Sequence, residues 1–309
     1  MTKHTLSEAS SDSLDINPEL APDDAKFTDD IASGGSANEP IEKPDRPGYQ
    51  EDTLVKGELI LKTLLDLDSG EAKRFSIDTG DADIEISAHS SNRIVVTAVC
   101  PPLADLATFN VVVKRKALNV SLRDVSIRKR VWRSKSEGVR LIVALPDRFF
   151  VQASSSSGSI AVNDVTGKVS TKSLSGNITL NGLSGAVVAQ THSGDIVGEC
   201  PSSACQIDTK SGNVKIVGLK GSFTCNSKSG DVCLKWIQSP VDAKVLIRAG
   251  RAAVNLVFPS DAKPNYRFIT SASAIMNEFE QHDSSTFRVR IISKRGNLSL
   301  RKADGTRTG

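Results

Sequence analysis

Aromatic residues are scarce in this chain of 309 residues. Phe, Trp and Tyr together make up 5% of the sequence, whereas Val, Ile, Ser and Gly are plentiful. Large rings supply much of the buried surface of many globular cores, while β-branched residues pack well on the pleated surface of a strand. The shortage of rings therefore predicts thin, stacked strands instead of a bulky globular core.

Local signatures of enzymes are also missing. The nucleophile motif G-x-S-x-G does not occur, and none of the four histidines lies in a catalytic motif. Gly167-Lys168 is similar to the end of a phosphate-binding loop, but Val169 replaces the required Ser or Thr and Val162 replaces the first glycine. We therefore predict a protein that is not an enzyme, binds no cofactor and takes no small-molecule substrate.

Long hydrophobic runs are absent too. No apolar stretch approaches the ~18 residues that cross a bilayer, and the first residues lack the apolar region of a signal peptide. The five cysteines are an odd number, which argues for reduced thiols in a chain without an export signal, and their spacings do not match a zinc site. These features predict a cytoplasmic protein with no bound metal; a peripheral position at the inner face of the membrane is the alternative.

Charges of opposite sign are separated along the chain. The formal net charge is +3, yet residues 1–50 carry 4 basic and 11 acidic side chains, a net of −7 that leaves +10 on the remainder. The segment 1–52 has no apolar periodicity and cannot bury enough surface to offset chain entropy, so it is predicted to be a disordered acidic tail. We favour a solubilising role for the tail; the alternatives are association with the basic body and a regulated anionic partner.

A Ser-Gly dipeptide recurs every 18 residues through the middle of the chain. A short fixed period indicates one small unit stacked on copies of itself. Hydrophobic residues alternate in two short runs within each unit, which predicts a single-chain β-solenoid with two strands per coil and two parallel sheets. Glycine at each corner is expected to adopt a positive φ. The structural turn glycines are Gly158, Gly176, Gly194, Gly212 and Gly230.

The same alternation assigns the interior of the solenoid. Each turn glycine is followed after two, four, seven, 11 and 13 residues by a side chain that is expected to point inward. This pattern places Cys205 and Cys225 in the core as small apolar residues. It also assigns inward positions to Pro201, Ile237 and Val241.

Two polar columns accompany the glycines. Inward hydroxyls at Ser173, Thr191, Thr209 and Ser227 are expected to form a ladder in which each bonds its neighbour along the stack. The residue after each glycine is Ser, Asn or Asp, and calcium-binding β-rolls place Asp at a similar period. One such side chain per turn falls short of the six or more oxygens that calcium requires, so we favour turns in which Asn and Asp bond their own backbone.

The prediction divides the chain into four parts. The disordered acidic tail covers 1–52, a β region that caps the solenoid covers 53–150, the repeat solenoid covers 151–302 and a disordered end covers 303–309. Open ends of a stack are aggregation-prone edges. We expect the strands of the cap region to cover one end, and the excursion at 259–286 and the Lys- and Arg-rich last strand to blunt the other.

The string VRLIVALPDRFFVQASSSSGSI, followed by Ser-Gly-[Asn/Asp]-[Ile/Val] repeats, resembles the bacterial "putative adhesin" domain family, which has the toast-rack type of β-solenoid. Leu145-Pro146 and the five Ser-Gly pairs carry the match, which extends over roughly 54–302. The resemblance implies a fold and no catalytic residues. Members of the family are mostly of unknown function, and several are associated with envelope stress systems.

A basic segment is the main candidate for binding. Residues 112–148 contain 11 Lys or Arg and 3 Asp or Glu. Such a hairpin can engage an anionic membrane or an acidic protein, and less favourably nucleic acid, or it can dock the acidic tail; a hairpin that only stays soluble and blocks edge pairing is the alternative. The candidate anion- and partner-binding residues are Arg128, Lys129, Arg130, Trp132, Arg133 and Lys135.

These features together predict a non-catalytic β-solenoid that serves as a scaffold for protein interaction or for self-association. The alternative is a peripheral envelope or membrane-stress factor that binds an anionic membrane surface through the basic segment.

Overall fold

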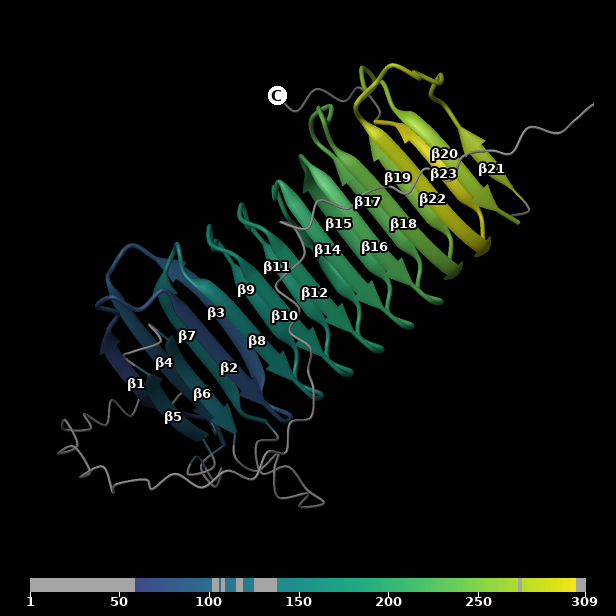
Figure 1. Ribbon diagram of the computed structural model, residues 1–309. Coiled ribbons are helices and arrows are strands. Elements are labelled where there is room, and N and C mark those ends of the chain that lie inside the picture. The colour runs from purple at the N-terminus through teal and green to yellow at the C-terminus, as the bar shows by residue number, and fades with distance from the viewer. Residues whose placement is uncertain are drawn as a thin grey trace, which may run out of the picture. The chain divides into compact units, whose positions relative to one another are not determined.

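The computed structural model describes residues 59–101, 106, 109–114, 119–124, 138–271 and 274–303. These ranges contain 23 strands and no α-helix, and the strands form two sheets (Figure 1). All of these described residues belong to one compact unit. The prediction of an all-β chain is confirmed.

The two sheets are long and differ in strand number. The 12-stranded sheet has the order β1 (Ile60–Asp68), β4 (Arg93–Cys100), β7 (Arg140–Pro146), β3 (Asp83–His89), β9 (Ile160–Asn163), β11 (Ile178–Asn181), β13 (Ile196–Glu199), β15 (Val214–Leu219), β17 (Val232–Trp236), β19 (Val254–Phe258), β23 (Leu298–Lys302) and β21 (Ile275–Asn277). The 11-stranded sheet has the order β20 (Asn265–Thr270), β22 (Arg288–Arg295), β18 (Lys244–Arg251), β16 (Ser222–Ser227), β14 (Ala204–Thr209), β12 (Val187–Thr191), β10 (Val169–Ser173), β8 (Phe150–Ser155), β2 (Arg74–Thr79), β6 (Asn119–Asp124) and β5 (Phe109–Lys114).

Each repeat gives one strand to each sheet, and successive coils pair in parallel and in register. Ile160 pairs with Ile178, and Ile178 with Ile196, in the 12-stranded sheet, while Val169 pairs with Val187 in the 11-stranded sheet. Identical or similar side chains therefore form columns between the sheets, and these five residues are at most 1% exposed. The core consists of such columns, because a coil this thin can bury apolar surface only against the next coil. The β-solenoid of two-strand coils is confirmed.

The turn glycines line up in a column, but not for the predicted reason. A Cβ atom built on Gly176 would lie 2.1 Å from the carbonyl oxygen of Gly158, and one on Gly212 would lie 1.8 Å from that of Gly194. The expected positive φ is wrong, since none of the five turn glycines has one. The described glycines that do are Gly70, Gly138, Gly182, Gly218 and Gly296. Close stacking of successive corners, not the handedness of the backbone, requires glycine here.

The inward hydroxyls also bond differently from the expectation. Thr209 donates its hydroxyl to the carbonyl oxygen of Gly212 at 3.2 Å and accepts the Gly212 N–H at 3.0 Å. Ser227 donates to the carbonyl of Gly230 at 2.6 Å. These bonds lie within a single turn, so the expected ladder along the stack is wrong. The buried hydroxyl instead satisfies the backbone of the tight corner three residues later.

The residue after a turn glycine does form side-chain bonds along the stack. The Oδ1 atom of Asn177 accepts the backbone N–H of Asp195 at 2.9 Å, Oδ1 of Asp195 accepts that of Asn213 at 2.8 Å, and Oδ1 of Asn213 accepts that of Asp231 at 3.0 Å. We expected these side chains to bond their own backbone, and that expectation is wrong. They join each coil to the next.

The coil that follows Gly230 is longer than the others. The step between Phe223 and its partner Val245 is 22 residues. Val241 is 80% exposed and Ile237 55% exposed, so their inward assignment is wrong. The inserted residues shift the register, and Trp236 and Val245 are the buried residues instead.

The other interior assignments depend on the same register. Cys205 and Cys225 are buried, as the alternation predicts. Pro201 is only half-buried, and its neighbour Cys200 lies in the core instead. The prediction for Pro201 fails because strand β13 ends at Glu199, so the alternation does not continue through the turn.

Strand order departs from chain order at the N-terminal end of the sheets. The coil of β2 and β3 lies between the coil of β8 and β9 and that of β6 and β7, although it comes before both in the chain. β1 and β4 pair antiparallel, as do β5 and β6. Both sheets continue through residue 150, so the predicted domain boundary there stays a prediction.

The C-terminal end shows a similar exchange. β20 and β21 are the outermost strands, and the later strands β22 and β23 lie inside them. The basic last strand β23 is therefore not the edge, contrary to the expectation, whereas the 259–286 excursion provides both edge strands. Aromatic rings gather beneath this end: the Phe258 ring lies 4.5 Å from that of Trp236, 5.2 Å from that of Phe287 and 6.1 Å from that of Phe279, between centroids.

Candidate functional site

A groove of about 1150 Å³ lies on the outer face of the 11-stranded sheet. It extends from β10 across β12, β14, β16 and β18 to β22, so each coil contributes side chains at equivalent positions. Outward residues on a strand alternate with core residues. The same register that aligns the core therefore aligns the groove into rows.

The first row is polar and runs along the middle of the strands. Lys172, Gln190, Asp208, Asn226 and Arg248 are successive register partners. Asn226 donates from Nδ2 to Oδ1 of Asp208 at 2.5 Å, and Arg248 donates from Nη1 to Oδ1 of Asn226 at 3.4 Å. Gln206 donates to the other carboxylate oxygen of Asp208 at 3.2 Å. Both oxygens of Asp208 are thus engaged by amide groups.

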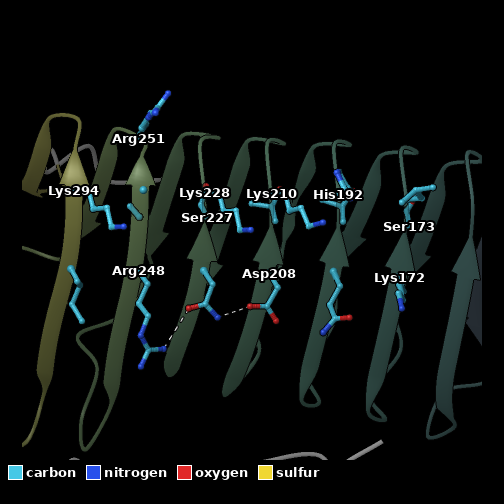
Figure 2. A pocket seen from close by; sticks show the side chains of 18 of the residues that line it. Lys172, Ser173, His192, Asp208, Lys210, Ser227, Lys228, Arg248, Arg251 and Lys294 are labelled. Carbon is cyan, nitrogen blue, oxygen red and sulfur yellow. Dashed lines mark hydrogen bonds between the residues drawn. The ribbon is translucent and has the colours of Figure 1, made fainter. Parts of the chain in front are cut away.

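The second row lies at the ends of the strands, two residues further along each coil. It consists of His192, Lys210, Lys228, Gly250 and Lys294. Each of these directly follows a buried residue, and the buried residues are register partners on neighbouring strands. Figure 2 shows the lysines side by side along the stack, with Arg248 lower on β18 and Arg251 reaching away from the sheet. Strand spacing in a sheet is about 4.8 Å, so each step in the row moves a side chain by that distance.

The groove is strongly basic. Seven Lys or Arg side chains line it, against the single carboxylate of Asp208. The ion pairs of Arg93 with Asp66 and of Arg123 with Asp78 both lie outside the groove. The binding residues predicted from the sequence do not include this surface. Its signal is the residue before each Ser-Gly pair, which is His192, Lys210 or Lys228 in three successive units.

The comparison with known families decides the classification. The family model described as Toastrack DUF4097 matches residues 65–305. The chain belongs to this family. The resemblance inferred from the Ser-Gly repeats is confirmed, and the match covers both the cap strands and the repeat coils of this toastrack domain.

Two solved structures match this chain at low sequence identity. The crystal structure of a "putative adhesin" from Bacteroides fragilis is 15% identical, with a TM-score of 0.46; the alignment covers 80% of this chain and 98% of that one. That of a "putative cell adhesion protein" from Clostridium sporogenes is 9% identical, with a TM-score of 0.24, and the alignment covers 80% of this chain and 100% of that one. No curated protein matches the sequence of this toastrack domain.

The candidate residues chosen from sequence fall into two groups. Arg128, Lys129, Arg130, Trp132, Arg133 and Lys135 lie outside the described residues, so their role stays a prediction. The five turn glycines lie in the described coils, where they allow close stacking and offer no side chain to a ligand. Among the described residues, the groove is therefore the candidate binding surface.

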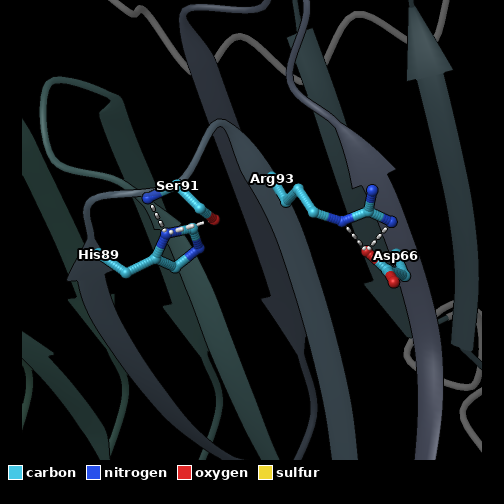
Figure 3. A network of polar contacts seen from close by, with 4 residues as sticks. All are labelled: Asp66, His89, Ser91 and Arg93. Atoms are coloured by element: carbon cyan, nitrogen blue, oxygen red, sulfur yellow. Dashed lines mark hydrogen bonds and ion pairs between the residues drawn. The ribbon is translucent and has the colours of Figure 1, made fainter.

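One exposed network has residue types found in hydrolases. Ser91 contacts Nδ1 of His89 through its hydroxyl at 2.9 Å and donates its backbone N–H to the same nitrogen at 3.0 Å. Asp66 instead pairs with Arg93 at 2.6 Å, and Figure 3 shows the two pairs as separate contacts. A Ser-His-Asp relay requires the carboxylate to orient the imidazole. This geometry does not provide that contact.

The cysteines of the toastrack domain sit mainly in its core. Burial raises the pKa of the Cys225 thiol to about 12, with a smaller contribution from the charge of Asp208. A hydrogen bond to Cys200, together with burial, raises the pKa of Cys205 well above its usual value. Raised values keep these thiols protonated, which makes them poor nucleophiles and metal ligands.

Two further findings concern the described residues alone. They contain no group of three or more His, Cys, Asp or Glu side chains placed to hold a metal ion. They also contain no helix of the length and apolar character that a membrane span requires.

Proposed function

We propose that this toastrack domain is a non-catalytic scaffold that binds a partner protein along the groove of the 11-stranded sheet. The observation that carries the proposal is the alignment of outward side chains into two rows over six strands. A concave surface with charged and amide groups at fixed spacing suits a partner with acidic side chains.

The rigidity of the coils supports this role. Asp195 and Asn213 bond the backbone of the next coil, and Ser193 and Ser211 donate their hydroxyls to carbonyls 19 residues earlier at 3.4 and 3.2 Å. Together with the parallel ladders, these bonds fix each coil against its neighbour. A surface that is already ordered loses little conformational entropy when a partner binds.

Binding at the side of the stack is favoured over end-to-end assembly. Oε1 of Gln281 accepts the backbone N–H of Tyr266 on the outermost strand β20 at 3.2 Å, and Asn265 and Gln281 bond each other at 3.0 Å. A covered edge is a poor template for another strand. Self-association, and the membrane role through the segment around Trp132, stay predictions.

A cytoplasmic location is part of the proposal. The five cysteines are all free thiols, four of them buried. Unpaired cysteines are typical of reducing compartments. Fractionation of cells that produce the full chain tests this point, and recovery in an oxidising compartment or with the membrane pellet would contradict it.

Site-specific photo-crosslinking tests the proposed groove. A photoreactive amino acid replaces Gln190, which is exposed in the first row of the groove, in full-length protein expressed in its native cells. The expected result is a discrete crosslinked product of defined mass that mass spectrometry assigns to a protein with an acidic segment.

The matched control places the same amino acid at Val197, which is exposed on the opposite sheet. We expect no discrete product from that position. The same products from both positions, or none from Gln190, would contradict the proposed groove.

A further inference from the structure

Gly250 interrupts a row of cations. Ala249 pairs with Ser227 on one side and with Ser293 on the other, so the neighbours of Gly250 in the row are Lys228 and Lys294. A Cβ atom on Gly250 would lie 2.2 Å from the carbonyl oxygen of Lys228. The backbone of Lys228 fills the place where a side chain would begin, so no side chain stands between Lys228 and Lys294 in the row.

Four cationic residues lie near Gly250 in the groove, and one of them, Arg251, reaches away from the sheet (Figure 2). Lys228 and Lys294 lie one coil away in either direction, about 4.8 Å by strand spacing. Arg248 lies two residues earlier on the same outward face of β18, and Arg251 follows directly. All four side chains line the groove with Gly250 and are exposed. Arg248 also donates a hydrogen bond to Asn226.

These charges are not compensated within the described part of the chain. Arg251 is the register partner of Arg295, which also lines the groove, and like charges directly opposite each other destabilise a sheet. Asp208 is the only carboxylate in the lining, and amide groups occupy both its oxygens. The arrangement costs stability unless an anion binds there.

The chemistry of these four cationic groups indicates the anion. Two guanidinium groups offer paired N–H donors and two ammonium groups act as point charges, a combination that suits tetrahedral oxygens. A phosphate monoester carries about −1.5 to −2 charges at neutral pH and three acceptor oxygens, whereas one carboxylate offers a single charge. The lining contains no Phe, Tyr or Trp ring on which a nucleobase could stack.

We propose that the cationic residues next to Gly250 in the groove, Lys228, Arg248, Arg251 and Lys294, form a binding site for a phosphate monoester group on a partner protein. The inference deepens the proposed function and rests on it, because it names the anionic group that the groove of this scaffold recognises.

The test measures binding to the full-length protein by isothermal titration in three arms at matched ionic strength. The probes are inorganic phosphate, a phosphoserine peptide with its unphosphorylated form, and phosphatidylcholine vesicles with and without phosphatidic acid. We expect saturable binding that depends on the phosphate. The phosphoserine peptide is expected to bind most tightly, because the proposed partner is a protein. Tighter binding of the vesicles or of inorganic phosphate would overturn the assignment to a phosphorylated protein.

The test variant is Arg251→Gln with Lys294→Gln, and the control is Lys215→Gln with Lys235→Gln. The control lysines are exposed on the 12-stranded sheet, and replacing them removes the same net charge as the test variant. Loss of two charge-assisted contacts is expected to weaken phosphate binding at least about tenfold in the test variant, with no comparable loss in the control. The Tm of the test variant should equal or exceed that of the wild type, because it removes like-charge repulsion.

Equal binding by the two variants, or no saturable binding in any arm, would overturn the site. A peptide with Glu in place of phosphoserine that binds as tightly would also overturn it and assign a carboxylate site instead. Crosslinking from Gln190 is independent of phosphate, so a failed phosphate site remains distinguishable from a failed interaction groove.

Discussion

Gly194 packs directly against the carbonyl oxygen of Gly176, and a Cβ atom at position 194 would lie 2.1 Å from that oxygen. No real Cβ contact is that short, and both atoms belong to backbones held by ladders on either side. The corner therefore cannot yield as a flexible side chain would. The observed spacing of the coils requires glycine at position 194, and a side chain at that position would force the two coils apart.

Replacement of Gly194 by alanine tests this relationship. The substitution forces two coils apart, and we expect a loss of at least about 3 kcal/mol in the free energy of unfolding, at the upper end of overpacking effects. Gly194→Val should be worse still. Urea denaturation followed by circular dichroism measures the change.

Gly70→Ala provides the contrasting control. Gly70 has a φ of +52° and nothing within 4 Å of a built Cβ, so only backbone strain opposes a side chain. That strain amounts to about 1–2 kcal/mol for alanine. Equal losses at the two positions would show that stacking is not the reason for the glycine column.

The same substitution is expected to have opposite effects on stability at two buried threonines. Thr209 bonds both the N–H and the carbonyl of Gly212, so Thr209→Val leaves two backbone groups unpaired and should cost about 1–3 kcal/mol. The hydroxyl of Thr171 is buried and has no partner. Thr171→Val should therefore be neutral or stabilising, because it removes an unsatisfied polar group.

Thermal and urea unfolding of the two valine variants measure this difference. Each variant keeps the shape of the side chain, so packing changes little. A Thr171→Val variant as unstable as Thr209→Val would contradict the assignment of the hydroxyl to the corner backbone.

The side-chain ladder predicts a specific response at Asp195. Its Oδ1 atom accepts the N–H of Asn213, and an amide oxygen can do the same. Asp195→Asn should leave stability unchanged, whereas Asp195→Ala should lose about 0.5–1.5 kcal/mol. Equal stability of the two variants in urea unfolding would argue against the ladder.

Calcium should have no effect on stability. The Oδ1 atoms of Asn177, Asp195 and Asn213 are occupied by backbone N–H groups of the next coil, which leaves too few free oxygens for a hard cation. We expect the same Tm in calcium and in a chelator. A Tm that rises with calcium concentration would contradict this expectation.

The repeat period predicts the architecture because residues one period apart occupy the same place in successive coils and so form the core columns. Ser-Gly at an 18-residue step is enough to align Ile160 with Ile178 and Val169 with Val187, and the structure confirms the stack. The prediction of a positive φ at the turn glycines was wrong. A sequence shows that a side chain is missing there, but it does not show whether the backbone angle φ or a neighbouring backbone excludes the side chain. The same limit applies to Thr209, whose partner lies in its own turn.

Features that depend on irregular coils could not be predicted. The 22-residue step that ends at Val245 changes the register without altering the local alternation. It also places Gly250 in the cation row, although Gly250 is the next glycine after Gly230 and would be taken for a turn glycine. The turn position falls on Ala252 instead. The exchange of strand order at both ends depends on contacts between distant segments, and no local pattern encodes it.

Buried thiols predict how stability depends on pH. Burial raises the pKa of Cys225 from 9.0 to about 12, so the folded state keeps a proton that the unfolded state releases above pH 9. The stabilisation from this thiol is fully present below pH 9 and is lost as the pH rises from 9 towards 12. Each such group lowers the free energy of unfolding by about 1.4 kcal/mol per pH unit in that window.

Cys225→Ala should reduce that loss, and Ile207→Val is the matched control because it truncates another buried core residue and keeps every thiol. Urea denaturation between pH 8 and pH 10.5 measures the slopes. We expect the wild type and Ile207→Val to lose stability in parallel, and Cys225→Ala to lose about 1.4 kcal/mol less per pH unit above pH 9. If Cys225→Ala shows the wild-type slope, water reaches this column of the core and the thiol titrates as it does in the unfolded chain.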